Sequence, residues 1–161
     1  MGPDGDLVRR RLARGCRCFG VWIGDDLAGY GWLSTGPEWI GELELEVRPG
    51  EGEGYIWNCC TLPAHRRRGV FRSLLLSITA VAREEGMRRM WIGSVAIPAE
   101  RAVAPSGFKP ALIFDSWSIA GLRLMRIEPA PAADVALVAS ALRVLNAGPG
   151  VRLGRARPRR H

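Results

Sequence analysis

The sequence is poor in several residue types and has no long apolar run. It holds one lysine, two histidines and two tyrosines, and none of its apolar stretches approaches the length of a membrane span. Residues 1–11 lack the apolar region of a signal peptide. The four cysteines lack zinc-site spacing, so we expect free thiols in a reducing compartment and no metal site. These absences predict a cytoplasmic protein without a membrane anchor.

Length and composition indicate one globular domain. A chain of 161 residues with 47% hydrophobic residues can bury a single core and is not disordered by composition. The net charge of +7 depends on an arginine-rich C-terminus, because basic and acidic residues otherwise number 18 and 16. We expect residues 149–161 to be a disordered tail, with nonspecific attraction to nucleic acid as the less favoured alternative.

The most informative stretch is residues 54–86. The run from Tyr55 to Leu62 is rich in aromatic and β-branched residues, which predicts a largely buried strand that ends at Pro63. Apolar residues then recur at helical spacing from Leu74 to Ala82, which predicts an amphipathic helix. Between strand and helix lies a short turn with four arginines and a glycine.

That turn has two interpretations. The first turn of a helix has unpaired N–H groups and a positive dipole end, so main chain at residues 68–72 can hold a pyrophosphate. Gly69 permits close approach, and the arginines add forked donors. The alternative is an ordinary crossover loop whose arginines are solvated.

A family resemblance favours the first interpretation. Arg66-x-x-Gly69-x-Phe71, after a strand and before an apolar helix, resembles the acyl-CoA signature of the GCN5-related N-acetyltransferases (GNAT). A second landmark follows, in which residues 98–102 and then Ser106-Gly107-Phe108 resemble the family's short helix and the entry to its next strand. The resemblance covers residues 16–127.

The resemblance implies an α/β (α+β) fold with a mainly antiparallel mixed sheet flanked by helices. We expect one short helix in residues 1–15 and the acyl-CoA-binding domain in residues 16–128. Residues 129–148 are expected to form a C-terminal helix that packs on the core or forms a homodimer contact. Because only about fifteen residues precede Cys16, we expect a shortened N-terminal lobe. The family's acyl-pantetheine arm lies between the strands expected at residues 55–62 and 89–96, where they splay.

An acidic stretch precedes the central strand. Residues 40–47 alternate leucine and valine with glutamate, which predicts one half-buried strand. Six glutamates lie between residues 38 and 53, with Arg48 as the only basic residue among them. A solvated strand face is the preferred interpretation, and an acidic wall that attracts a cationic amine is the alternative.

The resemblance also implies the cosubstrate and the residues that hold it. Acetyl-CoA would lie along the end of the central strand and the turn after it. The expected contact residues are Cys60, Thr61, Leu62, Arg66, Arg67, Arg68, Gly69, Val70, Phe71 and Arg72. Main-chain N–H near Thr61 or Leu62, beside a strand bulge, would polarise the acyl carbonyl.

The group that deprotonates the amine is less clearly marked. The family often has a glutamate eleven residues before the signature arginine, a position that holds Tyr55 here. Tyrosine is a poor base at neutral pH, so Glu53, Glu44 or Glu46 acting through water is an alternative. The family's usual acid, a tyrosine, is replaced by Val103. No histidine–carboxylate pair accompanies Cys59 or Cys60, and the resemblance implies direct transfer, which is the family's usual mechanism.

The predicted function is N-acetylation, by direct attack on acetyl-CoA, of a small-molecule amine or a protein amino group. One alternative is a catalytically weak or inactive CoA-binding domain. The other, less favoured, is an arginine-rich protein that binds nucleic acid.

Overall fold

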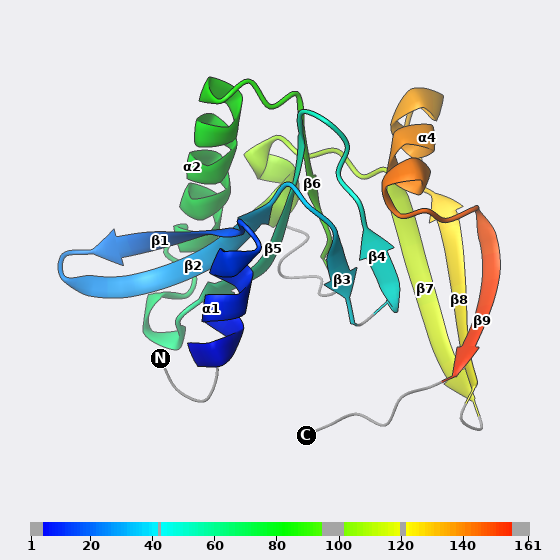
Figure 1. Ribbon diagram of the computed structural model, residues 1–161, viewed down its shortest axis with the longest axis horizontal. Coiled ribbons are helices and arrows are strands. Elements are labelled where there is room, and N and C mark those ends of the chain that lie inside the picture. Colours follow the sequence, from blue (N-terminus) through cyan, green and yellow to red (C-terminus); the bar gives the residue numbers. More distant parts are fainter. Residues whose placement is uncertain (1–4, 42, 95–101, 120–121, 156–161) are drawn as a thin grey trace. The chain divides into compact units, whose positions relative to one another are not determined.

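The computed structural model describes residues 5–41, 43–94, 102–119 and 122–155, and it divides the chain into two compact units (Figure 1). Unit 1 comprises Met1–Glu38 and Val47–Phe108, and unit 2 comprises Trp39–Glu46 and Lys109–His161. Helices and mixed sheets alternate along the chain, so the expected α+β class is confirmed.

A four-stranded sheet forms the centre of unit 1, in the order β1-β2-β5-β6. The strands are β1 (Arg17–Ile23), β2 (Asp26–Ser34), β5 (Glu53–Thr61) and β6 (Arg89–Ile92). Neighbours pair antiparallel except β5 and β6, which are parallel because helix α2 (Val70–Glu84) joins them. The first pair closes at Gly24-Asp25, the turn chemistry seen in the sequence.

Helix α2 covers one face of this sheet and makes the core of unit 1. The buried residues of α2 recur at helical spacing. Three of them form a hydrophobic core cluster with two strand residues. Its members are Leu33, Ile56, Leu74, Leu75 and Ile78. The short helix η2 (Ala104–Ser106) and the half-buried Val103 and Phe108 pack beside this core.

Helix α1 (Gly5–Ala13) lies on the opposite face. Strand alternation puts Trp32 on the other side of β2 from Leu33, and Arg11 of α1 contacts the Trp32 ring. The end of α1 is fixed by Glu38, whose carboxylate accepts two hydrogen bonds from Arg14 Nη2 (3.0 and 2.9 Å) and one from Cys16 Sγ (3.0 Å). Gly15, at φ +82°, ends the helix as expected.

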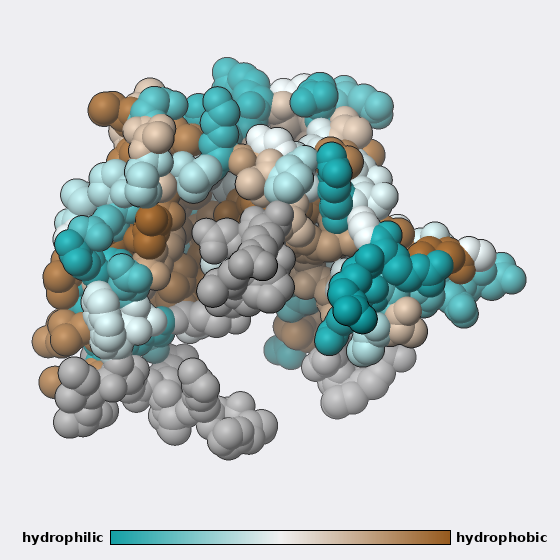
Figure 2. Space-filling model, turned by 180° about the vertical axis from the view of Figure 1, so that it is seen from behind, coloured by the Kyte–Doolittle hydropathy of each residue, from teal (hydrophilic) through white to brown (hydrophobic). Residues whose placement is uncertain are grey.

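Unit 2 contains a three-stranded antiparallel sheet, β7 (Leu112–Ile119), β8 (Leu122–Pro129) and β9 (Gly150–Arg155). Helix α4 (Val135–Val144) begins at Asp134, whose carboxylate accepts the Leu137 N–H at 2.7 Å. One face of the sheet packs with α4 around Met125 and Ile127. Val151 and Leu153 of β9 are 65% and 69% exposed. Figure 2 shows apolar groups at the molecular surface among hydrophilic ones.

Two expectations about secondary structure are wrong. Residues 40–47 do not form one strand, because two strands that pair with each other, β3 (Glu38–Ile40) and β4 (Leu45–Val47), take its place. The C-terminal tail is not disordered throughout, since residues 150–155 form β9 beside β8. Residues 156–161 lie outside the described part, as does most of the expected short helix at 98–102.

The boundaries of the two units also differ from the expected division at residues 128 and 129, because the β7–β8 hairpin belongs with α4 and β9. In the described part of the chain, no helix is long and apolar enough to cross a membrane.

Candidate active site

The turn between β5 and α2 has an irregular backbone that exposes its arginines. After the 3₁₀ helix η1 (Pro63–His65), Arg67 takes φ +61° and Gly69 takes φ +77°, both left-handed. The side chains of the three turn arginines and of Arg72 in the first turn of α2 are solvent-exposed, and Arg66 Nε lies 3.5 Å from Thr61 O. Arg68 Nη1 lies 3.2 Å from His65 Nδ1, so His65 contacts a cation and has no carboxylate among its described hydrogen-bond partners.

Gly69 is the N-cap of α2 and leaves that helix end open. No side chain caps the helix, and no heavy atom of the protein lies within 4 Å of a Cβ built on Gly69. The first intrahelical bond is Ser73 N–H to Gly69 O at 2.9 Å, so the N–H groups of Val70, Phe71 and Arg72 precede it. This arrangement can hold an anion with several oxygens by main chain, dipole and guanidinium together.

Strand β5 extends beyond its partner β6. The last pair is Ile56 with Ile92, whereas β5 continues to Thr61. On its other edge β5 pairs with β2, but a bulge interrupts the register between the pairs Trp32–Trp57 and Tyr30–Cys60. Asn58, at φ +46°, is a residue of this bulge. Among the described residues, residues 57–61 of β5 therefore have no strand pairing with β6.

The bulge adds a residue and so keeps the Cys59 side chain in the core beside α2. A Cβ on Gly31 would lie 2.8 Å from Cys59 Sγ, which explains the glycine opposite. Burial raises the Cys59 pKa from its ordinary value of 9.0 to about 12, with the nearby Cys18 and Cys60 as smaller causes and the Trp32 backbone acting in the other direction. A thiol that keeps its proton at neutral pH is not a nucleophile, which agrees with direct transfer.

One expected carbonyl donor is not available. The N–H of Leu62 donates to Ala28 O at 2.9 Å, so the prediction that it polarises an acyl carbonyl is wrong. The bulge also lies at Asn58–Cys59 and not beside Leu62. The main chain of β2 approaches that of β5 closely at this point, since a Cβ on Gly29 would lie 2.8 Å from Cys60 O.

Tyr55 and Glu53 lie on the face of β5 that α1 covers, because alternate residues share a face. Glu53 Oε2 accepts hydrogen bonds from Gly50 N–H (2.9 Å) and Trp91 Nε1 (3.2 Å), and Arg89 Nη1 lies 3.7 Å from Glu53 Oε1. These partners fix Glu53 in the turn before β5. Tyr55 is 7% exposed, and its hydroxyl lies 3.7 Å from a Cβ built on Gly93, just after β6 ends.

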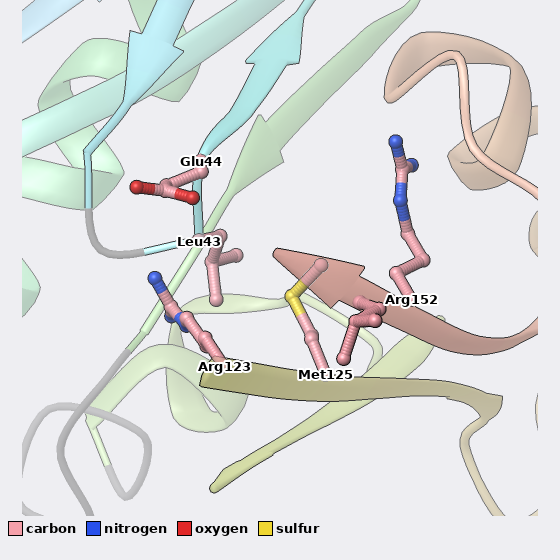
Figure 3. Close-up of a pocket in the computed structure, with 6 residues that line it drawn as sticks. Leu43, Glu44, Arg123, Met125 and Arg152 are labelled. Carbon is pink, nitrogen blue, oxygen red and sulfur yellow. The ribbon is translucent and has the colours of Figure 1, made fainter. Parts of the chain in front are cut away.

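Glu44 and Glu46, the other candidate bases, belong to unit 2. Glu44 takes φ +52° and lines a cavity of about 110 Å³ with Arg123, Met125 and Arg152 (Figure 3). Glu44 and Arg123 lie on one side of this cavity and Arg152 on the other. Its volume is below the roughly 300–1,000 Å³ of ligand pockets, so it does not form an acceptor site by itself.

The structure also reveals a charged residue that the sequence did not single out. Arg11, read there only as part of a basic helix, lies 93% buried against Trp32 and Trp57 on the same face as Tyr55. The sequence feature that could have indicated these contacts is a basic helix that precedes strands rich in tryptophan. Among the described residues, no group of three or more histidine, cysteine or acidic side chains could hold a metal ion.

Comparisons with known proteins agree with this geometry. None of the curated proteins matches the chain. Among solved structures, an acetyltransferase from Bacillus subtilis in complex with CoA matches 73% of this chain and 65% of its own, with 23% identity and a TM-score of 0.50. A protein from Agrobacterium tumefaciens described as an acetyltransferase matches 68% of this chain and 73% of its own, with 18% identity and a TM-score of 0.51.

A third solved structure is an aminoglycoside acetyltransferase from an uncultured soil metagenomic sample. It matches 74% of this chain and 76% of its own, with 12% identity and a TM-score of 0.52. These likenesses concern the fold. The family model described as the acetyltransferase (GNAT) family matches residues 3–104, which include β5, the arginine turn and α2. The chain belongs to the GNAT acetyltransferase family.

Proposed function

We propose that the protein transfers an acetyl group from acetyl-CoA to an amine. The observation that carries this proposal is the open N-terminus of α2, where left-handed Gly69 and four exposed arginines surround unpaired N–H groups. The pyrophosphate would lie on Arg68, Gly69, Val70, Phe71 and Arg72, with Arg66 and Arg67 beside it. The pantetheine arm would follow β5 at Cys60, Thr61 and residues before them.

The reaction is direct attack. The amine nitrogen bonds to the acyl carbon, the C–S bond breaks, and the thiolate takes a proton from solvent or from the ammonium product. We place the acyl carbonyl beside the bulge at Asn58–Cys59, where strand pairing with β2 is interrupted. Tyr55 faces the same region and would position the amine or a water molecule.

The acceptor is a small-molecule amine or a protein amino group, and we expect a cytoplasmic location. Support for an amine comes from the family and from the fold likeness to an enzyme that acetylates aminoglycosides. Homodimer formation through α4 stays a prediction.

The proposed site is tested with Gly69→Glu and a matched control. A glutamate there would put bulk and negative charge against the pyrophosphate. Gly86→Glu is the control, because Gly86 lies after the other end of α2 with φ +80° and equally open space, so backbone strain and charge change alike. Wild type with acetyl-CoA at 100 times its Kd should gain about 2.7 kcal/mol of stability.

We expect Gly86→Glu to keep this gain and Gly69→Glu to lose most of it in thermal denaturation. Equal gains in both variants would refute the site. If acetyl-CoA binds but an amine panel gives no turnover, the chain is a CoA-binding domain without catalysis. If nucleic acid and not acetyl-CoA stabilises it, the arginine-rich alternative holds.

A further inference from the structure

Arg11 is a buried cation with no counter-charge in the described part of the chain. Its side chain is on α1, and its Cζ lies 4.2 Å from the Trp57 ring centroid and 5.0 Å from that of Trp32. Only 7% of the residue is exposed. Among the described residues, no carboxylate forms an ion pair with it, although exposed arginines of the same helix region, Arg9 and Arg14, each pair with an acid.

The surroundings of Arg11 have donors in excess of acceptors. Arg11 Nε and Trp57 Nε1 are both sealed from solvent, and neither has a hydrogen-bond partner among the residues that the structure describes. Neither Nη atom of Arg11 belongs to the buried side-chain atoms that have no hydrogen-bond partner. The small exposed part of Arg11 therefore includes its Nη edge. That edge is the fork that receives a carboxylate with two parallel N–H···O bonds.

Stability alone does not explain this residue. A buried charge is costly unless it is paired, and stacking on two indoles offsets only part of that cost. An apolar side chain would fill the space without leaving donors unsatisfied. Yet the helix end is fixed firmly in place, because Cys16 N–H donates to Arg11 O at 3.0 Å and the Glu38 carboxylate holds both Arg14 and Cys16.

The position of the guanidinium relates it to the reaction. Trp57 is the first residue of β5 beyond the last β5–β6 pair and directly precedes the bulge residue Asn58. It shares a strand face with Tyr55, two residues earlier. Helix α2 packs on the other face of β5, so an acceptor that contacts Tyr55 would lie on the same face as Arg11.

We propose that Arg11 binds a carboxylate of the acceptor, so that the preferred substrates are amines that carry a carboxylate near the amino group, such as free amino acids. This inference rests on the proposed acetyl transfer and specifies its substrate class. The Nη fork holds the carboxylate, the indoles of Trp32 and Trp57 hold the guanidinium, and the amine then lies over the strand segment beside the bulge.

The test compares pairs of acceptors that differ only in the carboxylate: phenylalanine with phenethylamine, and tryptophan with tryptamine. Wild type should show kcat/KM about 10- to 100-fold higher for each acid, the range for a charge-assisted hydrogen bond. Arg11→Met keeps the apolar stem and should bring the ratio near one, because kcat/KM for each acid falls towards that of its amine. Arg11→Lys keeps the charge but not the fork and should give an intermediate ratio. Arg9→Gln, an exposed arginine of the same helix, is the control and should keep the wild-type ratio.

A binding measurement separates this inference from the proposed function. Phenylalanine, without acetyl-CoA, should change the tryptophan fluorescence of wild type and of Arg9→Gln but not of Arg11→Met. Thermal shift with acetyl-CoA tests the cosubstrate site independently, so its failure leaves the carboxylate result intact. The inference is overturned if wild type does not prefer the acids, if Arg11→Met keeps the preference, or if inorganic phosphate displaces phenylalanine at lower concentration than acetate does.

Discussion

At the scale of single residues, Tyr55 is the side chain that we propose positions the amine or a water molecule. Its hydroxyl lies near Gly93, where β6 ends and β5 continues alone. Tyr55→Phe removes only that hydroxyl, so turnover should fall roughly 10- to 1,000-fold if it positions a proton transfer. The Kd for acetyl-CoA should hardly change, because the expected pyrophosphate site is the turn before α2.

Steady-state kinetics on a confirmed acceptor, with acetyl-CoA binding measured beside them, decide this prediction. Full turnover by Tyr55→Phe would make the tyrosine part of the pocket wall. Glu44, Glu46 and Glu53 would then be the next candidates, with Glu53 already bonded to Gly50 and Trp91.

Cys59 gives a prediction about pH. Its pKa is raised to about 12 by burial, while an unfolded chain ionises the thiol near 9.0. The unfolded state therefore loses the proton first, and stability falls as pH rises from 9 towards 12. At pH 10 this thiol should lower the free energy of unfolding by about 1.4 kcal/mol relative to pH 7.

The measurement is urea denaturation of wild type and Cys59→Ala at both pH values. The alanine leaves the same cavity at each pH, so the difference in pH dependence isolates the thiol. Parallel stability losses in the two proteins would show that Cys59 ionises normally in the fold.

At the scale of elements, sequence predicted best where structure depends on neighbours along the chain. The unit of strand, turn and helix at β5 and α2 was located correctly because Pro63 ends the strand, Gly69 permits the cap conformation and apolar residues follow a helical period. Each of these signals is local. The binding role of the turn stays a prediction.

Sequence predicted poorly where register or tertiary contact decides. Alternation of Leu43, Leu45 and Val47 recorded which side chains are buried but not that two paired strands, β3 and β4, take the place of one. The bulge at Asn58 depends on the register between β2 and β5, and only the tolerance of asparagine for positive φ hinted at it. The sequence did not single out Arg11, because its contact with Trp57 joins parts of the chain that are distant in sequence.

The prediction that residues 150–155 are disordered was wrong for a related reason. Val151 and Leu153 are the only apolar residues of this segment, and glycine is a poor strand former, yet β8 presents an edge with which the segment pairs from Gly150 to Arg155. Residues 150–155 form a strand more because β8 offers a pairing edge than because of their own residue types.

At the scale of the whole molecule, the division into two units separates cosubstrate binding from C-terminal stability. The residues proposed to hold the cosubstrate lie in unit 1, whereas β9 belongs to unit 2. No side chain of β9 is in the described core cluster of unit 2, so its contribution comes mainly from backbone pairing with β8. Each such hydrogen bond contributes about 0.5–1.5 kcal/mol, and ordering the chain offsets much of that gain.

Truncation tests this separation. A chain that ends at residue 155 should unfold like the full chain, and one that ends at residue 149 should lose about 1–3 kcal/mol, because β8 loses the partner strand along its edge. Both should keep the full thermal stabilisation by acetyl-CoA. Hydrogen exchange should show faster exchange in β8 of the shorter chain and unchanged protection in α2. Loss of acetyl-CoA binding on removal of β9 would mean that unit 2 supports the cosubstrate site, and unchanged exchange in β8 would mean that β9 does not pair in solution.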